Sequence, residues 1–345
     1  MRDGEHTDYV SRITPIRQKE VKMAIAQDQI KASPPTTDAG WLGRLVGAKT
    51  KFQIRRALWG YLFALPWILG LILFWAGPTL ASFYFSFTNF EVIGTARWIG
   101  LENYTRAFAR DDLFWPSLGR TFTFSIINVP AVVGGALMLA ILLNQKLKGT
   151  NIFRTIFFVP HLLPAVAIAV LWTYLMQPRL GPINMMLRDL GVSSPPNWLA
   201  SANSALYAVT LITIWAGMGG NTMLIFLAGL QGVPQELYEA ADMDGASAFS
   251  KFWNVTIPLL TPTIFLVLVL AIIAALKVFT TAWVATQGGP SYATWFFALH
   301  IYTQAFQYFR LGYGSALAWV LAVIILFFTY IQVSSARRWV HYEGG

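Results

Sequence analysis

PTIFLVLVLAIIAALKVFTTAWV, residues 262–284, is a run of apolar and weakly polar residues in which Lys277 is the single charged side chain. Crossing the hydrocarbon core of a bilayer, roughly 30 Å thick, takes about 20 mostly apolar residues in a helix. This run is long enough for that crossing, so it predicts a transmembrane helix.

Five other runs share this apolar character, and together the six predict an all-α integral membrane protein with six transmembrane helices. The composition agrees, because 56% of the residues are hydrophobic and 12% are charged, about half the charge usage of an ordinary soluble domain. Prolines in or beside the runs are expected to act as ordinary kinks; they are Pro66, Pro78, Pro130, Pro160 and Pro164. The other five runs lie at residues 58–85, 121–143, 155–176, 205–230 and 312–333.

The charge pattern predicts the orientation in the membrane. Lys and Arg exceed Asp and Glu by 25 to 16, without an aromatic-interleaved basic patch for nucleic acid. Basic residues precede the first run, separate the second from the third and follow the sixth, which places both termini in the cytoplasm. Arginines on the opposite side weaken this signal, although no lysine lies in those loops. The chain then divides into an N-terminal tail with a basic juxtamembrane segment (1–57), a transmembrane domain (58–338) and a C-terminal tail (339–345).

With this orientation, residues 231–260 form a cytoplasmic loop. Pro234 predicts the start of a helix over residues 234–243, with acid in its first turn, and Gly245 predicts the turn that ends it. A second short helix is expected over residues 246–253, and its apolar side chains should pack onto the bundle; these are Ala246, Phe249, Phe252 and Trp253. Pro258 and Pro262 mark the return to the membrane.

Two interpretations of this loop follow from its residues alone. A short helix with an acid at Glu239 beside small Ala240 and Ala241 is suited to docking in a groove of another protein. A merely solvated connection is the alternative, and the residues alone favour it.

The spacing of the loop residues resembles that of a known family. Glu239-Ala240-Ala241 is followed after three residues by Gly245 and after nine more by the stretch VTIP at residues 255–258. This resembles the EAA loop of ABC importer permeases, with two apolar-for-apolar departures, Val255 and Ile257. Four further stretches resemble the sugar-type branch: RTIFFVPHLLPAVAIAVLW from residue 154, GPINMMLRDLG from 181, LAGLQGVPQELYEAA before the loop and ATQGGPSYAT from 285.

The resemblance implies a permease subunit in the cytoplasmic (inner) membrane of a bacterium or archaeon. It implies four kinds of partner: a second homologous permease, two ATPase subunits, an extracytoplasmic solute-binding protein and membrane lipid. It assigns coupling to the ATPases to Glu239, Ala240, Ala241, Asp242, Gly245 and Pro258. No cofactor is expected in this chain, because ATP and Mg²⁺ would be bound by the ATPase partners. The stretch GRLVGAKT, residues 43–50, lacks the glycine that a phosphate-binding loop needs before its lysine.

Residues for the solute pathway are expected on the helices on either side of the EAA loop. By position in maltose-type permeases these are Gly217, Met218, Asn221 and Ala275, and Trp215 and Lys277 are added as an aromatic and a charged group inside the runs. Two of these residues have alternative roles, since Asn221 can instead make an interhelical hydrogen bond and Lys277 can reach the headgroups or form a structural ion pair. His161, which has no second metal ligand nearby, is expected to be a hydrogen-bonded histidine at a kink.

Three classes of function are compatible with a polytopic chain. An ABC permease for a carbohydrate or related polar solute is favoured, and glycerol phosphate or a polyol is an alternative cargo. A secondary transporter would be expected to carry Asp or Glu inside its spans, and none is present in the six runs. A membrane-embedded enzyme would need paired carboxylates, clustered histidines or an activated nucleophile. Zero cysteines rule out disulfides and thiolate metal sites.

Overall fold

The computed structural model describes residues 51–91, 94–145 and 148–340. Their regular structure is helical throughout, and the one β-type pairing among them is an isolated bridge between Thr88 and Trp98. The predicted all-α class is therefore confirmed for the described residues. The N-terminal tail before residue 51, including residues 43–50, lies outside them. The chain forms two compact units, residues 1–79 and residues 80–345.

In the first unit the described residues form one helical segment. It consists of α3 (Lys51–Leu71) and a π-helical turn (Ile72–Ala76), and it leads into α4 (Gly77–Phe85). Residues Arg55–Phe85 are long and apolar enough to cross a membrane, which matches the first predicted run.

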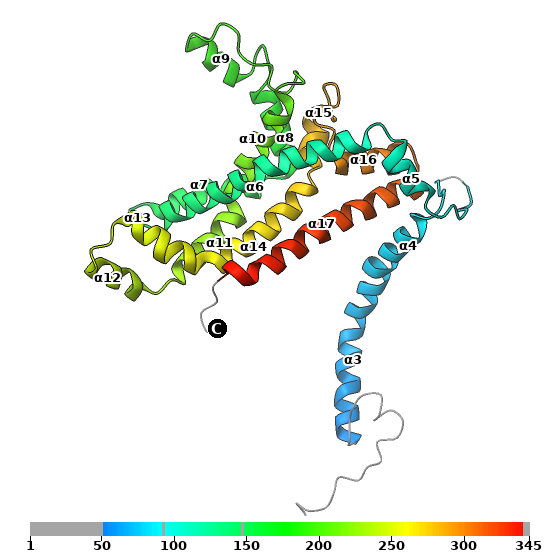
Figure 1. Cartoon of the computed structure of the whole chain (residues 1–345), viewed down its shortest axis with the longest axis horizontal. Coiled ribbons are helices and arrows are strands. Elements are labelled where there is room, and N and C mark those ends of the chain that lie inside the picture. The colour runs from blue at the N-terminus through cyan, green and yellow to red at the C-terminus, as the bar shows by residue number, and fades with distance from the viewer. Residues whose placement is uncertain (1–50, 92–93, 146–147, 341–345) are drawn as a thin grey trace, which may run out of the picture. The chain divides into compact units, whose positions relative to one another are not determined.

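The second unit contains the remaining helices (Figure 1). Its longest helices are α6 (Phe114–Asn144), α14 (Ile257–Leu276) and α17 (Leu311–Trp339). The shorter elements are α5 (Glu102–Ala109), α7 (Thr150–Leu162), α8 (Ala165–Leu175), α9 (Pro182–Asp189), α10 (Ala205–Met218), α11 (Gly220–Gln231), α12 (Gln235–Met243), α13 (Ala248–Lys251), a π-helical turn (Phe252–Thr256), α15 (Thr280–Thr286), α16 (Phe297–Tyr302) and a further π-helical turn (Thr303–Gln307).

The number of membrane crossings depends on two bent helix pairs. Four helical segments of the described chain are long and apolar enough to cross by themselves: Arg55–Phe85, Phe114–Asn144, Ala248–Thr286 and Leu311–Trp339. The third predicted run is broken into α7 and α8, which meet at 98°, and the fourth into α10 and α11, which meet at 44°. The described part therefore has four candidate spans, or up to six if each bent pair crosses once.

Local backbone chemistry explains both breaks. Leu163 and Pro164 are extended, with ψ of 138° and 137°, as expected where a proline disfavours helical geometry in the residue before it. Gly219 is also extended, at φ −82° and ψ −153°, and Gly220 has a positive φ of 54°. Glycine adopts such angles without the steric penalty of a Cβ.

A π-helical turn precedes each of two other prolines, and their helices continue without a break. The N–H of Gly77 bonds to the carbonyl of Ile72, and the N–H of Ile257 bonds to that of Phe252. Pro78 and Pro258 come next in the sequence. A proline ring clashes with the carbonyl four residues earlier in a regular helix, and the wider π turn relieves that crowding. The second short helix expected at residues 246–253 is present as α13, over Ala248–Lys251, and it continues through the π-helical turn into the fifth span without a break.

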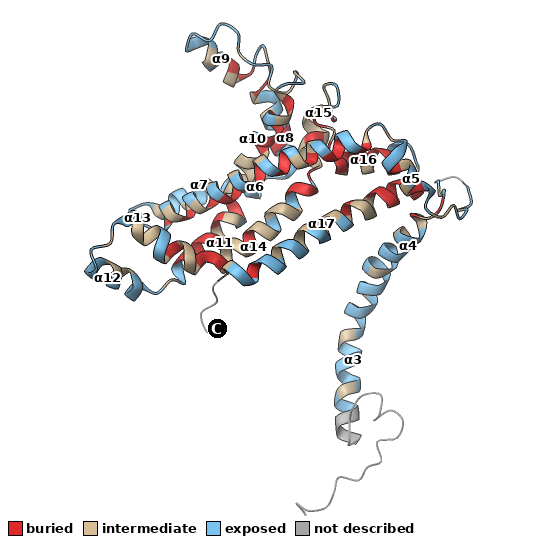
Figure 2. Ribbon diagram, viewed as in Figure 1, coloured by how far each residue is buried: buried red, intermediate tan, exposed pale blue. Residues whose placement is uncertain are grey.

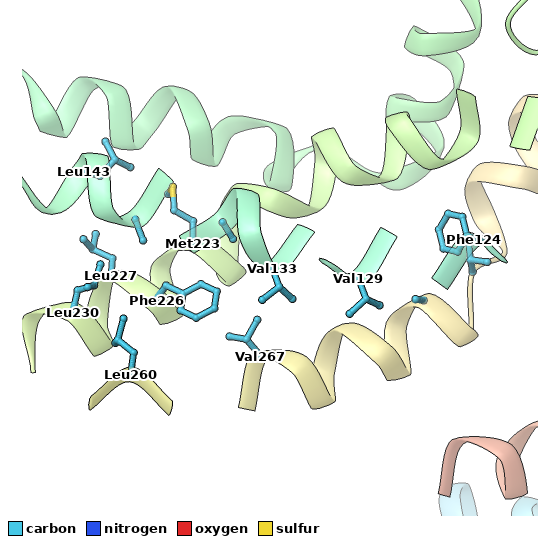
Figure 3. Close-up of a cluster of buried hydrophobic side chains, with 14 of the residues drawn as sticks. Phe124, Val129, Val133, Leu143, Met223, Phe226, Leu227, Leu230, Leu260 and Val267 are labelled. Carbon is cyan, nitrogen blue, oxygen red and sulfur yellow. The ribbon is translucent and has the colours of Figure 1, made fainter. Parts of the chain in front are cut away.

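The core of the second unit is built around α6, which packs against α10, α11 and α14. Figure 3 shows Val129 and Val133 of α6 pointing toward α14, with Val133 and Phe226 near Val267 and with Leu260 beside Leu230. Ala136 and Ala140 are fully buried, and such small side chains let helices in a membrane approach closely.

Large apolar side chains also cover the outside of this unit. Along α6 and α17 buried residues alternate with exposed ones (Figure 2), and Ile126, Met138 and Phe327 are more than half exposed. Soluble monomers rarely expose such contiguous apolar surface. The exposed faces therefore suit contact with lipid.

Candidate solute cavity and coupling loop

A cavity of about 460 Å³ lies in the second unit between α6, α10, α11 and the α14–α15 region. Its wall is mainly apolar, with two aromatic rings, Phe124 and Phe279. The polar side chains of the wall are amides and hydroxyls: Asn128, Thr213, Asn221, Thr222, Thr280 and Thr281. A mostly apolar pocket with a few convergent polar groups is the usual form of a small-molecule site.

The break between α10 and α11 shapes one side of this cavity. A Cβ on Gly219 would lie 2.2 Å from the carbonyl oxygen of Phe157, and one on Gly220 would lie 2.4 Å from the Cβ of His161. The close approach of α7 therefore requires glycine at both positions, and the next residue, Asn221, lines the cavity. His161 packs on this break, beside the bend between α7 and α8, and the hydrogen bond expected for it is not formed within the described residues.

Asn128 supplies the polar group of α6. Its Nδ2 donates to the hydroxyl oxygen of Thr213 at 2.9 Å, and that hydroxyl donates in turn to the carbonyl of Thr210 at 2.8 Å. The carbonyl oxygen of the Asn128 amide makes no hydrogen bond to the described part of the chain. It is therefore an acceptor available to a molecule in the cavity.

Three of the six residues predicted for the solute pathway lie in this wall: Gly217, Asn221 and Ala275. Asn221 is exposed and has no hydrogen-bond partner among the described residues, so the alternative interhelical hydrogen bond is not formed within them. Whether solute contacts these residues stays a prediction.

The other three residues lie outside the wall. Trp215 packs edge-to-face on Trp172 with ring centroids 5.5 Å apart, and Met218 lies 3.3 Å from the position of a Cβ on Gly135. Lys277 is exposed at the C-terminal end of α14 and forms no ion pair in the described structure. Its predicted structural ion pair is absent there.

Sequence reasoning missed Asn128, Thr213 and the threonines at 280 and 281. Asn128 carried the same signal as Asn221, an amide inside an apolar run. The threonines gave no such signal, because a threonine in a membrane helix commonly bonds to its own backbone.

The helix α12 presents the EAA residues, and a glycine turn ends it. Gly245 has φ +73°; its N–H bonds to the carbonyl of Asp242, and the N–H of Ala246 bonds to that of Ala241. This pair of bonds is the Schellman arrangement, which favours glycine. Glu239 and Ala240 are exposed.

Two side-chain contacts hold α12 against the next segment. Lys251 forms an ion pair with Asp242 at 2.6 Å, and the hydroxyls of Tyr238 and Thr256 lie 2.9 Å apart. Phe249 and Trp253 are 73% and 53% exposed. The prediction that these two rings pack onto the bundle is therefore wrong, because the continuous helix turns them outward.

A second polar cluster, which the sequence pattern did not predict, lies near the start of α6. The indole N–H of Trp295 donates to Nδ1 of His300, so the proton of the imidazole is on Nε2, which donates to Asp111 at 2.9 Å. Tyr313 donates its hydroxyl to the same carboxylate. Burial alone would raise the pKa of Asp111, but these bonds and the N–H of Leu113 hold the pKa well below its usual value.

The sequence pattern of the family described as binding-protein-dependent transport system inner membrane component matches residues 131–341. The chain belongs to this family. It is 39% identical over 287 residues to a probable ABC transporter permease protein, YesP, of Bacillus subtilis, covering 82% of this chain and 92% of that protein. It is 37% identical to the trehalose/maltose transport system permease protein MalF of Thermococcus litoralis, covering 84% and 98%.

A solved structure shares the fold. The permease fold in a crystal structure of a bacterial ABC transporter that imports the acidic polysaccharide alginate aligns with a TM-score of 0.74, at 23% identity over 83% of this chain and 98% of that one. The resemblance to sugar-type ABC permeases is thus confirmed by the relatives, and the chain is a multi-pass membrane subunit of an ABC transporter.

Proposed function

We propose that this chain is one permease subunit of an ATP-driven importer, and that a carbohydrate or related polar solute passes through the cavity between α6, α11 and α14. The observation that carries the proposal is that two amides with free hydrogen-bonding groups, Asn128 and Asn221, lie with the partly exposed ring of Phe279 in one cavity at a helix break. Broken helices commonly form solute sites in transporters. The trehalose/maltose permease of Thermococcus litoralis supports the cargo class.

In this proposal each bent helix pair crosses the membrane once, giving six spans with both termini in the cytoplasm. The hairpin of α12 and the following segment then lies on the cytoplasmic side. Since the chain carries one EAA loop, we propose a second permease beside it, two ATPase subunits that bind ATP and Mg²⁺, and an extracytoplasmic binding protein that delivers the solute.

The coupling residues Glu239, Ala240, Ala241, Asp242 and Gly245 would contact the ATPases, and Pro258 would fix the helix that returns to the membrane. Closing of the ATPases on ATP would then switch the cavity between outward and inward access. Moving a two-state balance from 1:99 to 99:1 takes about 5.5 kcal/mol of differential binding. The partners supply that energy through the loop.

A charge reversal tests the coupling role. Glu239→Lys should leave the chain inserted and the binding protein able to load solute, while import and solute-stimulated ATP hydrolysis fall about tenfold or more, because a docked surface rejects the wrong charge. Asp189→Lys, a reversal of another exposed acid outside the loop, is the control and should import normally. Normal import by Glu239→Lys would contradict the coupling role and show that the loop is only a solvated connection.

A further inference from the structure

Among the described residues, no ionisable side chain lines the wall of the proposed cavity. Its polar members are two asparagines and four threonines, and all others are apolar or glycine. The helices that build the wall carry few ionisable residues at all: Arg120 on α6, Tyr174 on α8, Tyr207 on α10 and Lys277 after α14. None of the four lines the cavity.

This wall suits an uncharged solute. Amides and hydroxyls donate and accept hydrogen bonds, as sugar hydroxyls do, whereas a carboxylate, sulfonate or phosphate without a nearby cation would lose several kcal/mol of hydration. The break between α10 and α11 does not replace that cation. The C-terminal end of α10 and the N-terminal end of α11 meet at Gly219, so their opposite partial charges offset each other.

The free hydrogen-bonding groups of the wall also favour an uncharged polar solute. Asn221 offers both an acceptor and a donor without partners in the described residues, and Asn128 offers its carbonyl oxygen. Phe279, which is partly exposed, supplies a ring face for the C–H surface of a sugar, whereas Phe124 is buried behind the wall. We infer that this cavity passes uncharged sugars and discriminates against their anionic counterparts, an inference that rests on the proposed function and narrows its cargo.

The test uses the complete transporter, with its partner subunits and binding protein, in proteoliposomes. The probes are neutral di- and trisaccharides, each paired with the uronic acid in which one primary alcohol is oxidised to a carboxylate. The affinity of the binding protein for each probe is measured separately. Import efficiency divided by that affinity then reports the selectivity of the membrane subunits.

The expected result is a preference of about tenfold or more for the neutral member of each pair, typical of a site that leaves one buried charge unpaired. Asn221→Lys should shift the ratio toward the uronate by about tenfold, because it places a cation in the wall, and the isosteric Asn221→Asp should shift it the other way. If Asn221→Lys does not assemble, Thr222→Lys places the cation in the same wall.

Import of uronates by the wild type within about threefold of the neutral sugars would overturn the inference and leave the proposed carbohydrate import standing. So would a ratio that does not respond to either charge at Asn221. An assembled transporter whose loaded binding protein stimulates ATP hydrolysis, but which imports no carbohydrate of either charge, would overturn the proposed function as well.

Discussion

At Gly245 the backbone φ is +73°, and no atom of the described chain lies within 4 Å of the place a Cβ would take. A side chain there would strain the backbone by about 1 kcal/mol but would project into open space. Gly245→Val and Gly245→Asn should therefore both insert, and both should lower import about tenfold because the side chain meets the docked ATPase. Asparagine tolerates positive φ, so Gly245→Asn adds a side chain with little backbone strain. If Gly245→Asn imports normally while Gly245→Val does not, the defect of the valine variant comes from backbone strain, and docking of an ATPase at this position is contradicted.

Asp111 allows a second test of a single residue. Its folded-state pKa is depressed, so its contribution to stability is present above the unfolded pKa, about 3.9, and is lost as pH falls toward the folded pKa. Asp111→Asn should lower the free energy of unfolding by about 2 kcal/mol at pH 7, and this deficit should shrink below about pH 4. Thermal unfolding of the purified protein measures it. Asp112→Asn, at the exposed neighbour, should change little at either pH.

At the scale of elements, the break between α10 and α11 is the feature that the surrounding helices enforce. Gly220→Ala would place a Cβ 2.4 Å from His161 at a positive φ, so we expect a loss of about 3 kcal/mol or more. Gly134→Ala is the matched control, because nothing lies within 4 Å of its Cβ position on α6; there alanine should be neutral or stabilising by up to about 1 kcal/mol. Equal melting temperatures for the two variants would show that the break is not held by this contact.

At the scale of the whole molecule, the absence of cysteine makes the proposed topology directly measurable. Ala202→Cys, in the exposed loop before α10, should react with a membrane-impermeant maleimide in intact cells. Met243→Cys, at the 88% exposed end of α12, should react only after the cytoplasmic side is opened. The reverse labelling pattern would show that the chain is oriented opposite to the proposal. Labelling of both cysteine variants from outside would contradict the six-span arrangement.

The sequence by itself determined the features that depend on neighbouring residues. Apolar runs of sufficient length predict membrane helices because the thickness of the bilayer is fixed, and Gly245 predicts its turn because its conformation is local. The EAA spacing identified the family for the same reason, since a helix, a turn and a helix start occupy consecutive residues.

Only the tertiary structure decided which residues face one another. Asn128 meets Thr213 across 85 positions of sequence, and Asp111 meets Tyr313 across 202. The break at Gly219 is bounded by the carbonyl of Phe157, and the outward turn of Phe249 and Trp253 follows from a helix that passes Pro258 through a π turn. Periodicity and turn chemistry carry no information about such distant partners, so the cavity and its uncharged wall emerged only when the helices were packed together.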